Sequence, residues 1–187
     1  MRPKTIIAIV GLPTTGKSSL GRELAVATGI RFIDIDEGPA SCTLLQEPDP
    51  YRSDETRARE RARMTVAYIV LHAAVEANLA EDFSVIVSAT YSRHRNQDFL
   101  KAAVERGGGT LKIIWCQYRD TPEEIERRIN DRVARGVTGG CRSVSHYFDD
   151  KKRYEGIALP HIVVAMEGGD EGLTCALSQA LTYINEE

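Results

Sequence analysis

The sequence contains no long hydrophobic run, which argues against a chain built around membrane-spanning helices. Its uninterrupted apolar stretches, such as Ile6–Val10 and Val85–Val87, have the length of single strands. A helix needs about 20 apolar residues to cross a bilayer. We also expect no secretory signal, because no apolar h-region precedes the first of these stretches.

Cysteine is scarce and histidine is scattered. The four cysteines are widely spaced and include no CxxC pair, so the pattern predicts neither a disulfide framework nor a zinc site, and a reducing cytoplasm fits it best. The four histidines show no metal-ligand spacing. The cysteines are Cys42, Cys116, Cys141 and Cys175.

Lysine is also rare, because 18 of the 24 basic residues are Arg and only 6 are Lys. The net charge of −3 argues against broad nucleic-acid binding, for which a basic domain is expected. Arginine favours forked contacts with phosphate. The arginines concentrate in two clusters, each of which has a solvated helix face as its alternative interpretation. The clusters are Arg52, Arg57, Arg59, Arg61 and Arg63, and Arg127, Arg128, Arg132, Arg135 and Arg142.

The rest of the composition is that of an ordinary globular domain. Of the 187 residues, 42% are hydrophobic and 27% are charged, which provides for a sizeable core. No linker, repeat or shift in composition divides the chain. We therefore expect a single domain over residues 1–187.

Short apolar runs alternate with segments of helical periodicity. This alternation predicts an α/β fold with a five-stranded parallel sheet and helices on both faces. Residues 36–52 are rich in Pro and Gly and predict a loop. The predicted strands are Thr5–Val10, Arg31–Ile35, Val85–Ser88, Leu111–Cys116 and Ile162–Ala165. The predicted helices are Leu20–Thr28, Asp54–Leu79, Arg95–Glu105, Pro122–Ala134, Val144–Tyr154 and Gly172–Tyr183.

The segment Gly11–Ser18 fits the phosphate-binding pattern G-x-x-x-x-G-K-[ST]. It lies between a buried strand and a helix, the context in which that pattern is meaningful. Its glycines let the backbone approach phosphate oxygens, and its N–H groups supply positive potential. The alternative is a glycine-rich turn without a ligand. The predicted nucleotide-binding residues are Gly11, Pro13, Thr14, Thr15, Gly16, Lys17, Ser18 and Ser19.

Two side chains of this loop have predicted roles. Lys17 can reach the β- and γ-phosphates of ATP, and the Ser18 hydroxyl can bind Mg²⁺. The chain contains no NKxD-type sequence for reading guanine. Its compact size also favours a kinase over a motor ATPase, so we expect ATP and Mg²⁺ as cofactors.

The chain resembles the small-molecule P-loop kinases, in particular the gluconate kinase, adenylylsulfate kinase and zeta-toxin-like group. The resemblance extends over nearly the whole chain but depends on four patches. The first patch, GLPTTGKSSLGRELA, is similar to the family's phosphate loop and the helix after it, and the second, Phe32–Asp36, is similar to the Asp-x-Asp that ends strand two in these kinases. The third, Val87–Arg95, is similar to the Ser-Ala-…-Tyr-Arg stretch of gluconate kinases, and the fourth, Arg128–Arg132, is similar to the Arg-Leu-x-x-Arg of kinase lids. It implies a three-layer P-loop NTPase fold with a helical lid at about residues 127–142.

Asp34 and Asp36 are predicted at the carboxyl end of a strand beside the phosphate loop, where open α/β sheets bind ligands. Phosphoryl transfer needs a base for the attacking hydroxyl. We expect Asp36 to be that base and to contact substrate, while Asp34 holds a Mg²⁺-bound water or a loop amide. The reverse assignment stays open, as does a purely structural role. Pro39 stands where the family often has a basic residue, so the acceptor is undefined.

Three further residues are candidates by resemblance. Ser88 stands at the end of strand three, where gluconate and adenylylsulfate kinases also have Ser, and would hold a Mg²⁺-bound water. A helix cap or a packed strand residue is its alternative role. Arg93 and Arg95 would face an acceptor that carries phosphate or carboxylate.

Arg128 and Arg132 are four residues apart and share one face of a predicted helix, whose start is marked by Thr121-Pro122-Glu123-Glu124. The resemblance implies that this helix closes over the transferring phosphoryl group, with Arg132 stabilising its charge and Arg128 supporting it. Gly136, Gly139 and Gly140 would allow the motion. The alternative is an exposed helix whose arginines pair with Glu124 and Asp131.

The predicted function is transfer of the γ-phosphate of ATP to a hydroxyl of a small metabolite such as a sugar, a sugar acid or a nucleoside. We expect a small-molecule acceptor as partner, neither nucleic acid nor membrane, and a monomer or homodimer. One alternative is a polynucleotide 5′-hydroxyl kinase, which needs a basic track for the strand. Another is a nucleotide-binding regulatory or toxin-like module.

Overall fold

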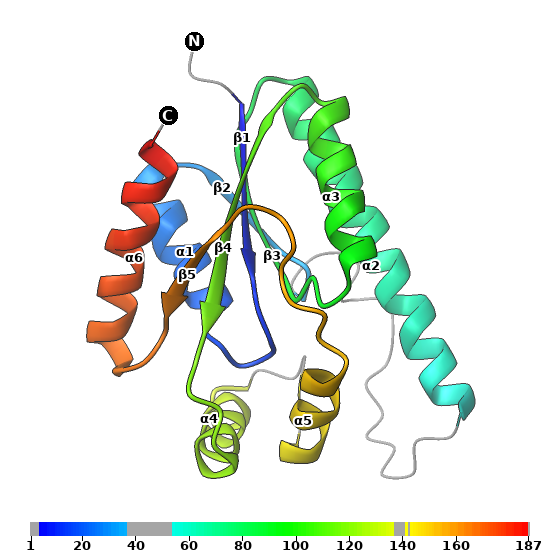
Figure 1. Cartoon of the computed structure of the whole chain (residues 1–187), viewed down its shortest axis with the longest axis vertical. Helices are drawn as coiled ribbons and strands as arrows, with labels where there is room; N and C mark the ends of the chain where they lie inside the picture. The colour runs from blue at the N-terminus through cyan, green and yellow to red at the C-terminus, as the bar shows by residue number, and fades with distance from the viewer. Residues whose placement is uncertain (1–3, 37–53, 137–140, 142, 187) are drawn as a thin grey trace.

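The structure is a computed structural model that describes residues 4–36, 54–136, 141 and 143–186. In this part of the chain, five strands form one sheet in the order β2-β3-β1-β4-β5, and every neighbouring pair is parallel (Figure 1). The predicted fold class is confirmed. The strands are β1 (Thr5–Val10), β2 (Arg31–Asp34), β3 (Val85–Ala89), β4 (Thr110–Gln117) and β5 (Ile162–Ala165).

Helices cover both faces of the sheet, and two more lie beyond its carboxyl edge (Figure 1). Helices α1 and α6 pack together on one face, and α2 and α3 on the other. Helices α4 and α5 lie at the edge where the strand arrows end. The helices are α1 (Lys17–Thr28), α2 (Asp54–Ala80), α3 (His94–Arg106), α4 (Pro122–Ala134), α5 (Val144–Lys152) and α6 (Gly169–Asn185).

Three of the helix ends that differ from the predicted boundaries have a clear local cause. Helix α1 begins at Lys17 because Gly16 adopts a left-handed backbone and starts the helix directly from the phosphate loop. Helix α6 begins three residues earlier than predicted, after Gly168 in the same conformation. Helix α5 ends at Lys152, and Arg153 and Tyr154 close it with turn hydrogen bonds.

The central strands are buried on both sides, as their continuous apolar sequences require. All five residues of β3 are buried, and so are five of the six residues of β1. One apolar cluster lies between the sheet and helices α2 and α3, and a second lies between the sheet and helices α1 and α6. The rigid sheet therefore holds the carboxyl ends of β1, β2 and β3 in a defined register.

Several predicted features lie outside the described residues. They are most of the predicted loop 36–52, with Pro39, Cys42 and Arg52, and part of the predicted lid, with Gly139, Gly140 and Arg142. Within the described residues, no helix combines the length and the apolar character needed to cross a membrane.

Candidate functional site

The loop between β1 and α1 is shaped by two glycines that admit no side chain. Gly11 has φ +142°, and a β-carbon there would lie 2.5 Å from the Cys116 carbonyl oxygen. Gly16 has φ +91°, and a β-carbon there would lie 2.8 Å from Met166 Cε. Thr14 also has a positive φ, 67°. Both glycines are needed because the loop turns tightly between β1 and α1, against β4 and the residue after β5.

Lys17 begins α1 and folds back over the loop. Its Nζ donates to the Leu12 carbonyl oxygen at 2.8 Å, and Thr15 Oγ1 donates to the same oxygen at 2.8 Å. Burial lowers the pKa of the Lys17 ammonium, and the Asp36 carboxylate opposes that shift. An anion at this position would favour the charged ammonium further, so the loop is suited to phosphate.

Asp34 and Asp36 lie beside Lys17 in different environments. Asp34 is buried, 5% exposed, and its Oδ1 accepts a hydrogen bond from the Asp36 backbone N–H at 2.9 Å. The Asp36 side chain reaches the surface of the site. Desolvation by the surrounding atoms, followed by the Asp34 carboxylate, raises the pKa of Asp36 above its usual value, while Lys17 and Arg132 oppose the shift. The two carboxylates thus differ in environment as well as in position, with Asp34 ordering the backbone at Asp36.

Three buried oxygens at the site have no hydrogen-bond partner among the described residues. They are Thr14 Oγ1, Asp34 Oδ2 and Ser88 Oγ. Asp34 and Ser88 are register partners on the adjacent strands β2 and β3, so their two oxygens lie at the same level of the sheet edge. Ser88 does not cap α3, because Arg93 occupies the N-cap position. Buried polar atoms nearly always have a hydrogen-bond partner. These three unpartnered oxygens are therefore suited to contact the water shell of a bound Mg²⁺ ion.

Arg128 of α4 fastens that helix to the phosphate loop. Its guanidinium donates to the Thr14 carbonyl oxygen at 2.6 Å and to the Met166 carbonyl oxygen at 3.2 Å, and its Nε donates to Glu124 at 3.3 Å. Its Cζ also lies 3.1 Å from the centre of the Tyr118 ring. The side chain is only 17% exposed. Arg128 is therefore a positioning residue for the loop in this structure.

Arg132 lies one turn further along α4 and is half-buried. It is close enough to lower the pKa of Lys17 and to oppose the raised pKa of Asp36. Residues far apart in the sequence thus meet at one charged centre formed by Lys17, Asp36 and Arg132. The alternative prediction, an exposed helix whose arginines pair with acidic neighbours, fits Arg127 better than Arg132. Arg127 is exposed and pairs with Glu124 and Asp131.

Helices α4 and α5 share a small apolar cluster that reaches the phosphate loop. Ile125, Ile129, Cys141 and Tyr147 are buried together, and Leu12 of the loop packs against them. The N-termini of both helices are capped, at Thr121 by a bond from the Glu124 N–H and at Ser143 by one from the His146 N–H. The Glu124 carboxylate is engaged by Tyr118 and Arg128.

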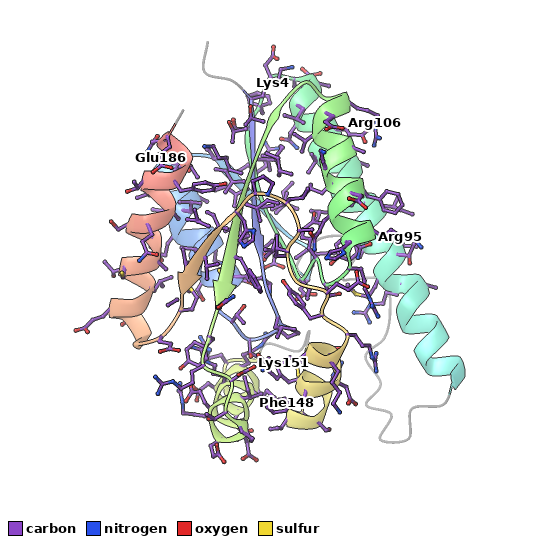
Figure 2. All side chains as sticks on the ribbon, in the orientation of Figure 1. Lys4, Arg95, Arg106, Phe148, Lys151 and Glu186 are labelled. Atoms are coloured by element: carbon purple, nitrogen blue, oxygen red, sulfur yellow. The ribbon has the colours of Figure 1, made fainter. Side chains whose placement is uncertain are left out.

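Arg93 and Arg95 make contacts outside the charged centre. Arg93 donates to Glu155 at 2.8 Å, and Arg95 lies 5.3 Å from the centre of the exposed Phe99 ring. Figure 2 shows Arg95 at the lower end of α3. The structure therefore does not join these two residues to Lys17, Asp36 and Arg132, and their acceptor role stays a prediction.

A buried cluster of Tyr68, Tyr91 and His72 lies near Asp36 and was not predicted from the sequence. The Tyr68 hydroxyl accepts a hydrogen bond from the Tyr91 backbone N–H at 2.9 Å, and the Tyr91 hydroxyl lies 3.3 Å from His72 Nε2. Burial lowers the pKa of His72 to about 4. Tyr118, under Arg128, was also not singled out. Helical spacing placed Tyr68 on one face of its helix, but its contact with Tyr91 could not be predicted, because the two residues come from different segments of the chain.

The chain is similar to several known proteins. A family model described as an AAA domain matches residues 6–146. The shikimate kinases of two Thermus thermophilus strains are each 27% identical over 131 residues, which are 70% of this chain and 65% of the relative. The chain thus spans 65% of the length of these curated relatives.

Two solved structures have a similar fold at low identity. A gluconokinase from Sinorhizobium meliloti 1021 has 20% identity and a TM-score of 0.58, with 98% of both chains covered. Kti12 from Chaetomium thermophilum, in complex with ADP-AlF₃, has 16% identity and a TM-score of 0.61, with 97% of this chain and 100% of that chain covered.

The parallel sheet and the loop after β1 define a P-loop nucleotide-binding domain with the kinase fold. The predicted resemblance to the P-loop kinases is confirmed. Because the family model covers most of the chain, the protein belongs to the AAA domain family.

Proposed function

We propose that this protein is an ATP-dependent phosphotransferase that moves the γ-phosphate of ATP·Mg²⁺ to a hydroxyl of a small metabolite. The observation that carries the proposal is the meeting of Lys17, Asp36 and Arg132 beside the phosphate loop, where Asp36 and Arg132 act on the pKa of Lys17, and Lys17 and Arg132 act on the pKa of Asp36. The kinase names of the relatives and of the gluconokinase neighbour support it.

In the proposed reaction, the acceptor oxygen forms a bond to the γ-phosphorus as the bond to the β–γ bridging oxygen breaks, and ADP leaves. Asp36 takes the proton of the acceptor hydroxyl. Its raised pKa makes it a stronger base than an ordinary aspartate. Lys17 and Arg132 stabilise the charge on the transferring group, and Asp34 holds the Asp36 backbone in place.

The metal would be held by few protein ligands. Ser18, Asp34 and Ser88 would hold Mg²⁺ directly or through water, and when bound it would add positive charge at the phosphates. The described residues contain no group of three His, Cys, Asp or Glu side chains able to hold a metal. Nucleotide phosphates would therefore complete the coordination, as is usual for Mg²⁺.

The test is acceptor-dependent release of ADP from ATP·Mg²⁺ across a panel of sugars, sugar acids, nucleosides and shikimate, with a 5′-hydroxyl oligonucleotide as one arm. We expect a small metabolite to stimulate release and Lys17→Ala to abolish it. Lys101→Ala is the matched control, because Lys101 is an exposed lysine on α3 paired with Glu105. Stimulation by the oligonucleotide alone would instead support a polynucleotide kinase.

A regulatory nucleotide-binding module is the second candidate, favoured by the structural likeness to Kti12. Such a module would bind ATP and hydrolyse it at a rate that no acceptor in the panel changes. ATP binding without any acceptor-dependent ADP release would therefore favour the module over the kinase.

A further inference from the structure

A buried hydroxyl group without a hydrogen-bond partner lies just after α5. Tyr154 follows the end of that helix, and its side chain as a whole is half-buried. Its hydroxyl oxygen is nevertheless buried, so the phenol ring points its hydroxyl into the molecule. Among the described residues, this oxygen has no hydrogen-bond partner. An unpaired buried hydroxyl costs free energy, so its presence here needs a reason.

The ring of Tyr154 packs on Trp115 of β4. The two rings are stacked, with their centres 6.0 Å apart. Trp115 also packs against the apolar cluster between the sheet and helices α2 and α3, and it is the register partner of Val10, the last residue before the phosphate loop. Tyr154 therefore lies near the carboxyl edge of the sheet, on the side of α2 and α3.

The chain directly after Tyr154 is fastened to the start of α3, beside which it runs before it reaches β5 (Figure 1). The Glu155 carboxylate accepts a hydrogen bond from the His94 backbone N–H at 2.7 Å. The buried Gln97 side chain donates to the Gly156 carbonyl oxygen at 2.6 Å. These contacts hold the Tyr154 hydroxyl in a defined place, as a binding group requires.

Tyr68 of α2 supplies a second hydroxyl on the same side of the sheet. Its oxygen accepts hydrogen bonds from the Tyr91 backbone N–H, at 2.9 Å, and from the Asn96 side chain. A phenol oxygen that accepts two hydrogen bonds still has its own proton to donate. Burial raises the pKa of Tyr68, and the Asp36 carboxylate adds to that shift, so the phenol keeps its proton.

The two hydroxyls connect the charged centre to the unpartnered oxygen. Burial also raises the pKa of Tyr154, and Tyr68 adds to that shift, so the two phenols are near neighbours. Tyr68 in turn is near Asp36. Asp36, Tyr68 and Tyr154 thus form a series that begins at the proposed base and ends at a buried hydroxyl that can both donate and accept.

We infer that Tyr154 binds the phosphate acceptor through a hydroxyl other than the one that reacts. An acceptor hydroxyl matches the unpartnered Tyr154 oxygen because it too can donate one hydrogen bond and accept another, and it can also accept the proton of Tyr68. The acceptor is therefore a polyhydroxylated compound, with one hydroxyl at Asp36 and a second between the two tyrosines.

Tyr154 is thereby a specificity-determining residue, and the inference rests on the proposed function because it concerns the acceptor of that reaction. One part of the Tyr154 side chain is exposed, so a small rotation of the ring would present its hydroxyl to a ligand. A compound with only the reacting hydroxyl would leave the Tyr154 oxygen unpaired and bind more weakly.

The first experiment measures binding without turnover. Trp115 is the only tryptophan of the chain and stacks on Tyr154, so its fluorescence reports on that ring. D-glucose, D-gluconate, shikimate and adenosine are each titrated in the presence of ADP·Mg²⁺. We expect at least one to change the fluorescence, and Tyr154→Phe to weaken its binding about tenfold through the loss of two hydrogen bonds. Tyr183→Phe is the matched control, because Tyr183 is a half-buried tyrosine on α6.

The second experiment separates the steps of the reaction. For a compound that stimulates ADP release, Tyr154→Phe should raise the acceptor KM about tenfold and leave kcat and the KM for ATP little changed. The analogue of that compound without the second hydroxyl should bind equally to the wild-type and Tyr154→Phe chains. An analogue that still loses tenfold in the variant would overturn the inference.

The stability of the free protein gives a third and independent readout. Tyr154→Phe should keep or raise the melting temperature, because it removes an unpaired buried hydroxyl. Tyr68→Phe should lower it, because the Tyr91 N–H loses its acceptor. A Tyr154→Phe chain with a lowered melting temperature and unchanged ligand affinity would show that the hydroxyl is paired within the chain, which would overturn the inference.

Failure of the inference and failure of the proposed function give different results. Acceptor-dependent ADP release with the same acceptor KM in the wild-type and Tyr154→Phe chains would overturn the role of Tyr154 and keep the kinase. Binding that Tyr154→Phe weakens, without any ADP release, would keep the role of Tyr154 in binding and refute phosphoryl transfer. A panel in which no compound changes the fluorescence of Trp115 would overturn the inference.

Discussion

The carboxylates of Asp34 and Asp36 are two residues apart and lie in different environments. Asp34 is buried and orders the Asp36 backbone through a 2.9 Å hydrogen bond. Asp36 reaches the surface of the site, next to Lys17 and Arg132. Under the proposed function, only the second position can reach an acceptor hydroxyl, while the first holds the second in place.

Asp36→Asn is expected to lower acceptor-dependent turnover by at least about 100-fold, because a positioned base supplies about 10²–10⁴-fold. Binding of ATP, measured by calorimetry, should change little. Since the base acts deprotonated and its pKa is raised, wild-type kcat/KM should begin to fall with decreasing pH at a higher pH than an ordinary aspartate would give. If Asp34→Asn shows this pattern and Asp36→Asn does not, the two roles are reversed.

His72 gives the folded chain a pH-dependent stability. Burial lowers the pKa of His72 to about 4, below its value of 6.5 in an exposed setting. The unfolded chain thus binds more protons between these values, and the free energy of unfolding decreases as pH falls from about 6.5 to about 4. By linkage, this one residue contributes about 3 kcal/mol across that window.

We expect His72→Phe to remove this contribution, since Phe can pack beside Tyr68 and Tyr91 without titrating. The check is urea unfolding of both chains at several pH values between 4 and 7. The wild-type curve of stability against pH should be the steeper one. Parallel curves would show that His72 takes no part in the acid sensitivity.

At the scale of elements, α4 carries two arginines with different contacts. Arg128 is nearly buried and binds the backbone of the phosphate loop and of the residue after β5, whereas Arg132 is half-buried beside Lys17 and Asp36. One turn of α4 thus binds the loop backbone through Arg128, and the next turn places the positive charge of Arg132 at the site. Leu12, packed under the same helix, couples its position to the loop.

Arg132→Ala is expected to reduce turnover by about 10²–10³-fold with little loss of ATP affinity, because its charge is needed most as negative charge develops on the transferring group. Arg135→Ala is the matched control, since Arg135 is exposed on the same helix end. Equal losses in turnover and affinity would reduce Arg132 to a binding contact.

Arg128→Ala should act mainly on stability. The change leaves the Thr14 and Met166 carbonyl oxygens without this donor, and we expect a loss of about 1–3 kcal/mol in the free energy of unfolding. Thermal or urea unfolding measures it. An unchanged stability with a turnover loss as large as that of Arg132→Ala would place Arg128 in the chemistry instead.

At the scale of the whole molecule, the phosphate loop joins three apolar clusters. It continues β1, which contributes to the clusters on both faces of the sheet, and Leu12 joins the cluster of α4 and α5. Gly16 also lies against Met166, which belongs to the cluster with α1 and α6. A ligand held by this loop should therefore stabilise the entire chain and not one segment of it.

ATP·Mg²⁺ at 100 times its Kd should add about 2.7 kcal/mol to the free energy of unfolding. For a chain of this size, that corresponds to a rise in melting temperature of about 5–10 °C in a single transition. Lys17→Ala should abolish the rise, and Ser88→Ala should weaken its dependence on Mg²⁺. A rise that survives in Lys17→Ala would place the nucleotide elsewhere.

The order of strands and helices and the phosphate loop were predictable from the sequence, because both depend on local pattern. Buried parallel strands such as β1 have continuous apolar sequences, and a loop that admits phosphate needs glycine at Gly11 and Gly16. The Asp34–Asp36 pair was found for a similar reason, since it directly follows a strand whose end must lie at the binding edge.

Contacts between distant elements were decided only by the tertiary structure. The sequence placed Arg128 and Arg132 on one helix face. The fold brings Arg128 against the loop backbone and Arg132 near Lys17 and Asp36. It also paired Arg93 with Glu155, placed Tyr91 over His72 and left the outer side of α2 exposed. Local pattern determines which backbone a segment forms, whereas a side chain's partner depends on which segments the packed sheet brings beside it.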